Sequence, residues 1–307
     1  MERRTFIRHT GLTLGALTFL GNHTFASMIN DPAWKIRMLS DKFGIFNERG
    51  GTIGFLLSGD GVVVIDAQFP DTAPHLIEEL KTRSKNPIRL LINTHHHADH
   101  TSGNIAFKGI VEHVVSHENS LANQKKVAVD NKTEDKQYYP DTVFNTSGWK
   151  EKMGKEHIKA HYFGPGHTNG DIMLHFQHAN IVHMGDLVFN RRHPFIDKSA
   201  GADIANWIKI LDKASNTFDT NTQFICGHAG TGYDVVAKTS DLLAFRNYLG
   251  NLLHFVDGQI KAGKTKDEIL LAKEIPGSPE WKGDNLDRSL TGAYTELQAK
   301  LTQPKQD

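Results

Sequence analysis

One cluster of side chains, residues 95–100, most constrains how this chain can fold. It reads His-His-His-Ala-Asp-His and follows residues 88–92, a short apolar run that predicts a buried strand. In extended geometry His95 and His97 share one face of the chain, whereas His96 points away. Imidazole and carboxylate are ordinary protein ligands of divalent metals. A His-x-His pair alone would be weak evidence for metal, because such pairs also occur on plain protein surfaces.

Three more metal-capable residues stand in similar surroundings further along the chain. His167 lies in a glycine-rich loop that precedes a predicted strand, and Asp186 and His228 each follow a predicted strand directly. If the strands are aligned, their ends meet at one edge of a sheet, which is a usual place for a functional site. We therefore expect these three side chains to converge with the histidine-rich strand end.

Strand and helix signals alternate along the rest of the chain. The patterns predict two strands within 51–66 joined by a hairpin turn at 59–61, further strands at 88–92, 111–115, 171–176, 180–184 and 223–226, and helices at 72–84 and 117–129. Residues 130–155 are polar and predict no regular structure. After about residue 236 the pattern becomes helical and includes a capping box at Thr265 and Glu268. No linker precedes these helices, so we expect them to pack on the core.

The combined motifs resemble those of the metallo-β-lactamase-fold hydrolases over roughly residues 45–235. The residues that carry the resemblance are His95-x-His97-x-Asp99-His100, His167, Asp186 and His228. It implies an α/β (α+β) fold of the αββα type, a four-layer sandwich of two mixed sheets with helices outside and the active site at one edge. It also implies that His95, His97 and His167 hold a first metal ion, that Asp99, His100 and His228 hold a second, and that Asp186 bridges both.

The resemblance implies a two-metal mechanism. The cofactors would be two divalent ions, zinc by ligand type, with iron or manganese as alternatives. A hydroxide held between two ions about 3.5–4 Å apart would attack a carbonyl centre. Asp99 would be catalytic as well as a ligand, because a ligand carboxylate can also carry protons. Cys226 precedes a predicted ligand, but we interpret it as a small buried hydrophobe.

Other residues near the motifs have supporting roles in this interpretation. Asp66 ends a predicted strand near the same edge and could accept a hydrogen bond from a metal-bound histidine or from the motif loop. Arg191 and Arg192 follow Asp186 closely. They either place a guanidinium near a substrate carboxylate or belong to a solvated basic loop.

Charge and the motifs together narrow the activity. Lys+Arg and Asp+Glu both number 35, and this balance argues against a nucleic-acid partner and therefore against a nuclease of the same fold. A non-catalytic relative would have lost ligands, and a redox relative would carry a different ligand set. We expect a hydrolase of a small lactone, thioester, amide or β-lactam. In the lactamases proper, the position of Asp186 is usually Cys or Ser, so a true β-lactamase is the alternative.

The first 26 residues predict export. Adjacent Arg3 and Arg4 precede an uncharged run rich in Leu, Gly and Ala, and Thr24-Phe25-Ala26 ends in small residues, which is typical of a twin-arginine signal peptide. Its removal takes away three basic residues and one acidic residue, leaving a net charge of −2. We expect a periplasmic single domain over 27–307, with a core at about 45–235 and C-terminal helices at about 236–307. No stable membrane anchor is expected after cleavage, and the oligomeric state has no sequence signature.

Overall fold

A computed structural model describes residues 33–302 of the chain. Residues 36–302 belong to one compact unit. The predicted signal peptide, 1–26, lies outside the described residues. Within 33–302, the helices are too short or too polar to cross a membrane.

The first sheet contains seven strands in chain order. They are β1 (Lys35–Met38), β2 (Phe43–Asn47), β3 (Ile53–Ser58), β4 (Gly61–Ile65), β5 (Ile88–Ile92), β6 (Val111–His117) and β7 (Thr142–Phe144). Strands β2 to β4 pair antiparallel, with the predicted hairpin turn between β3 and β4. Strands β4 to β7 pair parallel, so β4 and β5 end at the same edge of the sheet.

The second sheet contains six strands in the order β13-β12-β11-β10-β9-β8. Their bounds are β8 (Trp149–Met153), β9 (Glu156–His161), β10 (Met173–Phe176), β11 (Ile181–Asn190), β12 (Gln223–Ala229) and β13 (Val236–Ala237). Only β11 and β12 pair parallel, and their register shifts on both sides of Gly185. This irregular pairing surrounds the predicted metal ligand Asp186.

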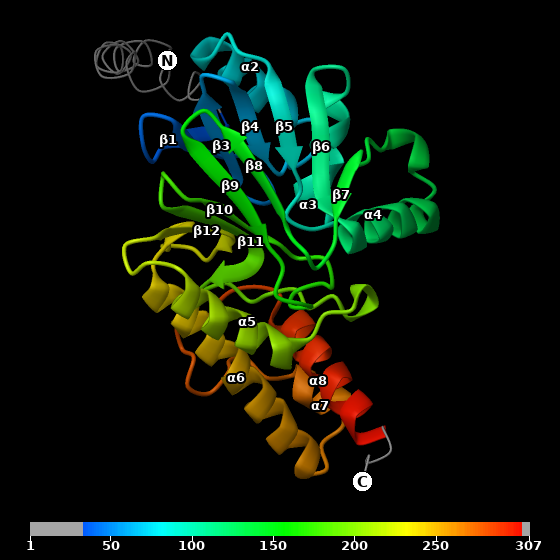
Figure 1. Cartoon of the computed structure of the whole chain (residues 1–307). Helices are drawn as coiled ribbons and strands as arrows, with labels where there is room; N and C mark the ends of the chain where they lie inside the picture. The colour runs from blue at the N-terminus through cyan, green and yellow to red at the C-terminus, as the bar shows by residue number, and fades with distance from the viewer. Residues whose placement is uncertain (1–32, 303–307) are drawn as a thin grey trace, which may run out of the picture. The chain divides into compact units, whose positions relative to one another are not determined.

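Helices cover the outer faces of the two sheets (Figure 1). They are α2 (Ala73–Arg83), α3 (Ala98–Thr101), α4 (Glu118–Asn131), α5 (Ile204–Thr217), α6 (Thr239–Lys261), α7 (Lys266–Leu270) and α8 (Leu286–Thr302), with 3-10 turns η1 (Ser102–Phe107), η2 (Glu134–Lys136) and η3 (Lys198–Ala200). One apolar core lies between the sheets, and a second lies between β10–β12 and the helices α5, α6 and α8. The expected sandwich of two mixed sheets with outer helices is confirmed.

The structure differs from the sequence expectation in several elements. Strands β7 and β8 lie within 130–155, where we expected irregular chain, and β9 follows directly at Glu156–His161. The expectation was wrong because β7 has only three residues and the three central residues of β8 are all exposed, so neither strand shows a clear alternation of buried and exposed positions. Helix α5 had no predicted counterpart. Strands β11 and β12 continue beyond their predicted ends, so Asp186 and His228 lie inside strands rather than after them.

Candidate metal centre

The seven predicted ligands come from five places in the fold. Strand β5 leads into the loop that carries His95 and His97, and α3 begins immediately afterwards with His97 as its N-cap residue. His167 lies in the loop between β9 and β10. Asp186 lies on β11 and His228 on β12. The structure brings all seven side chains into two adjoining groups of possible metal ligands.

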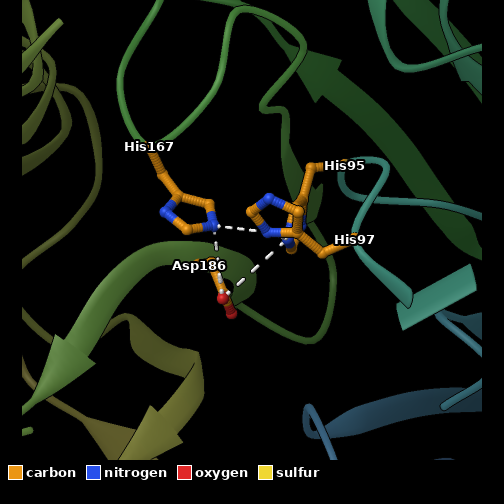
Figure 2. Close-up of side chains that lie close together, drawn as sticks. All are labelled: His95, His97, His167 and Asp186. Carbon is orange, nitrogen blue, oxygen red and sulfur yellow. Dashed lines mark hydrogen bonds and ion pairs between the residues drawn. The ribbon is translucent and has the colours of Figure 1, made fainter. Parts of the chain in front are cut away.

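The first group contains His95, His97, His167 and Asp186. Nδ1 of His97 lies 3.1 Å from Nε2 of His95 and 2.9 Å from Nε2 of His167. Asp186 Oδ2 lies 3.8 Å from Nε2 of His95 and 3.4 Å from Nε2 of His167. Figure 2 shows the imidazoles approaching one another from two loops above the carboxylate. Three nitrogen atoms and one oxygen atom therefore face one small volume.

The second group contains Asp99, His100 and His228, and it also meets Asp186. Nε2 of His228 lies 3.0 Å from Asp99 Oδ2 and 3.5 Å from Asp186 Oδ2. Nε2 of His100 lies 3.7 Å from Asp99 Oδ2 and 3.1 Å from Asp186 Oδ1. The Asp186 carboxylate consequently lies between the two groups and contacts histidines of both.

The pKa values in the first group keep its side chains in the protonation states that bind metal. Burial lowers the pKa of His95 well below its usual value and that of His167 to about 3, so both imidazoles are neutral at pH 7. Asp186 remains ionised, because His228 and His100 outweigh the effect of its burial and hold its pKa well below the usual range. Neutral imidazole and ionised carboxylate are the forms that bind metal.

The second group carries positive charge when no metal is bound. Burial alone would lower the pKa of His228, but Asp186 and Asp99 raise it to about 9. The pKa of His100 is likewise raised well above its usual value, since Asp186, Asp99 and Asp66 together outweigh the burial of its ring. A bound cation would replace these protons as the positive partner of the carboxylates.

Two buried atoms in the centre have no hydrogen-bond partner. They are Nε2 of His100 and Oδ1 of Asp186, which lie 3.1 Å from each other without the geometry of a hydrogen bond and have no other hydrogen-bond partner among the described residues. Buried polar atoms are rarely left without a partner, and each such atom in a native protein calls for a missing ligand, water or ion. The donor set, imidazole nitrogen plus carboxylate oxygen, is the one that zinc and similar divalent ions take. The residues therefore fit a pair of divalent metal ions.

Asp66 orients a ligand of the second group, His100, through a hydrogen bond. The residue is fully buried, and its Oδ2 atom accepts hydrogen bonds from His100 Nδ1 at 2.8 Å and from Thr94 Oγ1 at 2.8 Å. Its Oδ1 atom accepts a hydrogen bond from the backbone N–H of Thr94 at 2.8 Å. Because the proton of neutral His100 is held at Nδ1, its Nε2 lone pair is free to face the metal position.

Asp197 supports the first group in the same way, and sequence reasoning missed it. Its Oδ2 atom accepts a hydrogen bond from His97 Nε2 at 3.0 Å, which leaves Nδ1 of His97 facing the metal position. Its Oδ1 atom accepts from the backbone of Ser199 and Ala200 at the start of η3. The same carboxylate lies 3.5 Å from His96 Nε2. Nothing in the local sequence distinguishes Asp197 from an ordinary turn residue.

Two glycines make room for the ligands. A Cβ atom on Gly51 would overlap the imidazole of His100, and a Cβ atom on Gly227 would overlap Asp186 Oδ1. Cys226, directly before Gly227, is fully buried in the core and belongs to neither ligand group. These glycines are sequence signals for the site, because only glycine lets the backbone approach the ligands so closely.

The centre opens into a hollow of about 340 Å³. The ligands Asp99, Asp186 and His228 line it together with Phe189 and Phe195. Asp99 is the most exposed ligand carboxylate, with 30% of its side chain accessible, against 4% for Asp186.

The structure separates the two arginines that we considered as substrate contacts. Arg192 lines the hollow. The guanidinium of Arg191 points elsewhere, into ion pairs with Asp241 at 2.5 Å and Glu280 at 3.4 Å, and it lies over Trp281. Arg191 is therefore a packing residue of the C-terminal region.

Two residues of that region reach the hollow without having been expected there. They are Asn285, which directly precedes α8, and Arg288 in the first turn of α8.

Comparison with known proteins agrees with this geometry. The chain is 24% identical to the metallo-β-lactamase IND-1 of Chryseobacterium indologenes over 61% of this chain and 75% of that protein. Its fold is similar to a metallo-β-lactamase from Pontibacter korlensis, with a TM-score of 0.58 and 20% identity over 71% of this chain and 99% of the other. It is also similar to the inverting sec-alkylsulfatase Pisa1 from Pseudomonas sp., with a TM-score of 0.67 and 14% identity over 85% of this chain and 49% of the other.

The family profile described as the Metallo-beta-lactamase superfamily matches residues 47–228, more than half of the chain and every predicted metal ligand. With the two mixed sheets and the clustered His and Asp side chains, this match shows that the chain belongs to the metallo-β-lactamase superfamily of metal-dependent hydrolases.

Proposed function

We propose that the protein is a two-metal hydrolase that acts at the carbonyl centre of a small substrate such as a lactone, thioester, amide or β-lactam. The observation that carries this proposal is the position of Asp186. Its carboxylate contacts histidines of both ligand groups, as a bridging ligand must. A site for a single ion would have no need of the second group.

The chemistry follows from the arrangement of the side chains. Two bound divalent ions would supply an activated water and polarise the substrate's electrophilic centre. Asp99 is placed to accept the proton of the attacking water and return it to the leaving group, because it faces the hollow while its other neighbours are the histidines of the second group. Phe189 and Phe195 line the hollow and give it apolar surface beside the ligands.

A hydrolysis panel tests this proposal directly. The metal-loaded protein is given an aliphatic thioester, a lactone and nitrocefin, before and after treatment with a chelator. We expect at least one substrate to be cleaved, the activity to disappear with the chelator and to return with added zinc, and His167→Ala to abolish it. His113→Ala is the matched control, because His113 is an exposed histidine on β6 outside both ligand groups. Chelator-resistant hydrolysis would refute the proposal.

A true β-lactamase is the second candidate. Several relatives are named metallo-β-lactamases, including one from Bacillus cereus that is 26% identical over 71% of this chain. Against it stands Asp186, in a position usually occupied by Cys or Ser in lactamases. Nitrocefin hydrolysis at a rate above that of the thioester and the lactone would favour this candidate.

Zinc is the proposed native metal. Five of the seven proposed ligands are histidines, and imidazole is a preferred zinc ligand. Iron and manganese are the alternatives, since supply and geometry decide the native metal as much as affinity does. Elemental analysis of protein purified without added metal should give about two ions per chain, mainly zinc. A metal content near zero would contradict the two-ion assignment.

Export through the twin-arginine route is proposed from the sequence of residues 1–26. Arg3→Lys combined with Arg4→Lys should leave the protein in the cytoplasm, and unchanged periplasmic fractionation of that double variant would contradict it. We further propose that the partner is a small molecule and not a nucleic acid, because the hollow at the centre is small and the exported chain would carry a net charge of −2.

A further inference from the structure

Helix α8 is fixed against the loop that follows the metal ligand Asp186. Ser289 Oγ, in the first turn of α8, donates a hydrogen bond to the carbonyl oxygen of Pro194 at 2.6 Å. Further along the same helix, the carboxylate of Glu296 accepts a hydrogen bond from the backbone N–H of Ile204 at 2.7 Å. These buried contacts determine where the first turn of α8 lies relative to the metal centre.

The same first turn presents Arg288 to the hollow above the metal centre. Arg288 lines this hollow together with Asp99 and Asp186, and its guanidinium carbon lies 5.8 Å from the centroid of the Phe195 ring. Phe195 lies in turn 5.4 Å, ring to ring, from the metal-ligand candidate His97. The guanidinium is therefore separated from the ligand groups by about one aromatic side chain.

Arg192 lines the same hollow from the loop after β11. Among residues 33–302, no carboxylate forms an ion pair with either Arg192 or Arg288. Their neighbour Arg191 shows the opposite arrangement, because Asp241 and Glu280 neutralise it. Two arginines without acidic partners therefore line one small hollow. Each guanidinium offers a planar pair of N–H donors, which suits the binding of an oxyanion.

We propose that Arg192 and Arg288 bind an anionic group of the substrate, a carboxylate or a sulfonate-type group separated from the reacting carbonyl by a short apolar linker. This inference rests on the proposed function and specifies its substrate class. Phe189 and Phe195 line the hollow beside the arginines and would contact the linker. The C-terminal helix thereby becomes a specificity element of the enzyme, and Arg288 a substrate-binding residue.

The kinetic test uses matched thioesters with the metal-loaded full chain. The half phenyl thioester of glutarate carries the anion, its terminal carboxamide is the neutral isostere, and the corresponding sulfonate distinguishes the two anions. Arg288→Gln should raise KM for the anionic substrate about tenfold, which corresponds to about 1.4 kcal/mol. The value of kcat, and KM for the carboxamide, should stay within twofold. Arg192→Gln should act in the same direction, and Arg288→Lys should restore part of the loss.

The control is Lys282→Gln, which removes one positive charge from the exposed loop before α8, outside the hollow. It should leave all constants within twofold. A calorimetric titration with glutarate and glutaramide gives a readout that needs no hydrolysis, and Arg288→Gln should weaken only the binding of glutarate. Equal effects on charged and neutral ligands, or an Arg288→Gln variant indistinguishable from Lys282→Gln, would overturn the inference. If no thioester is cleaved, the proposed function fails for that class and the titration alone decides the inference.

Discussion

Asp66 and Asp197 should control different metal ions, although neither would touch a metal. Asp66 holds Nδ1 of His100, which belongs to the second ligand group, and Asp197 holds Nε2 of His97, which belongs to the first. Changing either residue to asparagine keeps its size and removes one charge. We expect Asp66→Asn to weaken the ion at Asp99, His100 and His228, and Asp197→Asn to weaken the ion at His95, His97 and His167.

The magnitude follows from the hydrogen bonds that each carboxylate makes. Asp197 Oδ1 already accepts from Ser199 and Ala200, so the amide of an asparagine would keep its oxygen there and turn its NH2 group toward His97. Two donors would then face each other, and the imidazole would have to move its proton to the nitrogen that should bind metal. Loss of such a supporting group costs about 10- to 100-fold in metal affinity. That range corresponds to about 1.4–2.7 kcal/mol.

The assay is competition between the protein and a fluorescent chelator, fitted with two binding steps. At a free-metal concentration chosen so that Asp66→Asn binds one ion, adding His228→Ala should cause no further loss of ion stoichiometry, because the ion of that group is already absent, whereas adding His167→Ala should remove the remaining ion. Asp171→Asn is the control, since Asp171 is a buried carboxylate that bonds Thr168 and no ligand imidazole. It should leave both affinities within threefold. If Asp66→Asn and Asp197→Asn weaken the same ion, the assignment of the two groups is refuted.

Three further outcomes are expected. Asp186→Asn should release the ion of the second group first and lose most of the activity, as measured by metal content and hydrolysis, and retention of two ions would contradict a bridging role. Burial lowers the pKa of His183 to about 4, below the usual value of 6.5, so the folded protein excludes a proton that the unfolded chain binds, and stability falls by up to about 3 kcal/mol as the pH decreases from 6.5 to 4. The melting temperature of His183→Asn should consequently fall less steeply over this range than that of the parent, and equal slopes would contradict this assignment. Chelation of the metals should lower the melting temperature reversibly, because the ions bind the folded state, and an unchanged melting temperature would count against metal binding.

The ligand positions could be predicted from the sequence because each one is tied to a strand. The parallel pairing of β4, β5 and β6 places the loop after β5 at one edge, and the parallel pair β11–β12 brings Asp186 and His228 together. Glycines mark the same places, since Gly51 and Gly227 leave space that ligand side chains fill. At these points the local sequence determines where a side chain lies in the fold, so short motifs are sufficient to predict the ligand positions.

Helix α5 was not predicted, although its sequence carries a helical pattern. Its buried residues Ile204, Trp207 and Leu211 follow a helical period, and Asp203 caps it by accepting a hydrogen bond from the backbone N–H of Asn206. The physical signal was therefore present in the sequence.

The supporting residues of the centre depend on contacts that no local pattern encodes. Asp197 meets His97 across 100 positions of sequence, and its own neighbours only make it a turn residue. Arg288 is a further case, because an arginine in the first turn of an amphipathic helix is ordinarily a solvated side chain. Its place at the hollow follows from the docking of α8 through Ser289 and Glu296, which are buried polar residues in a helix otherwise recognised by its apolar stripe.

The metal ligands and the residues that we assign to substrate recognition lie on different parts of the fold. Two metal ligands, Asp186 and His228, lie on paired strands, and the other five lie on α3 or in loops that follow strands of the two sheets. The residues that we assign to the substrate's anion lie on the loop after β11 and on helix α8. No metal ligand lies on α8, and Arg288 is an exposed residue of its first turn, so a substitution there changes the hollow without altering a ligand. Substitutions at Arg288 should therefore alter which substrate is preferred while the metals stay bound, and substitutions at Asp66 or Asp197 should do the reverse.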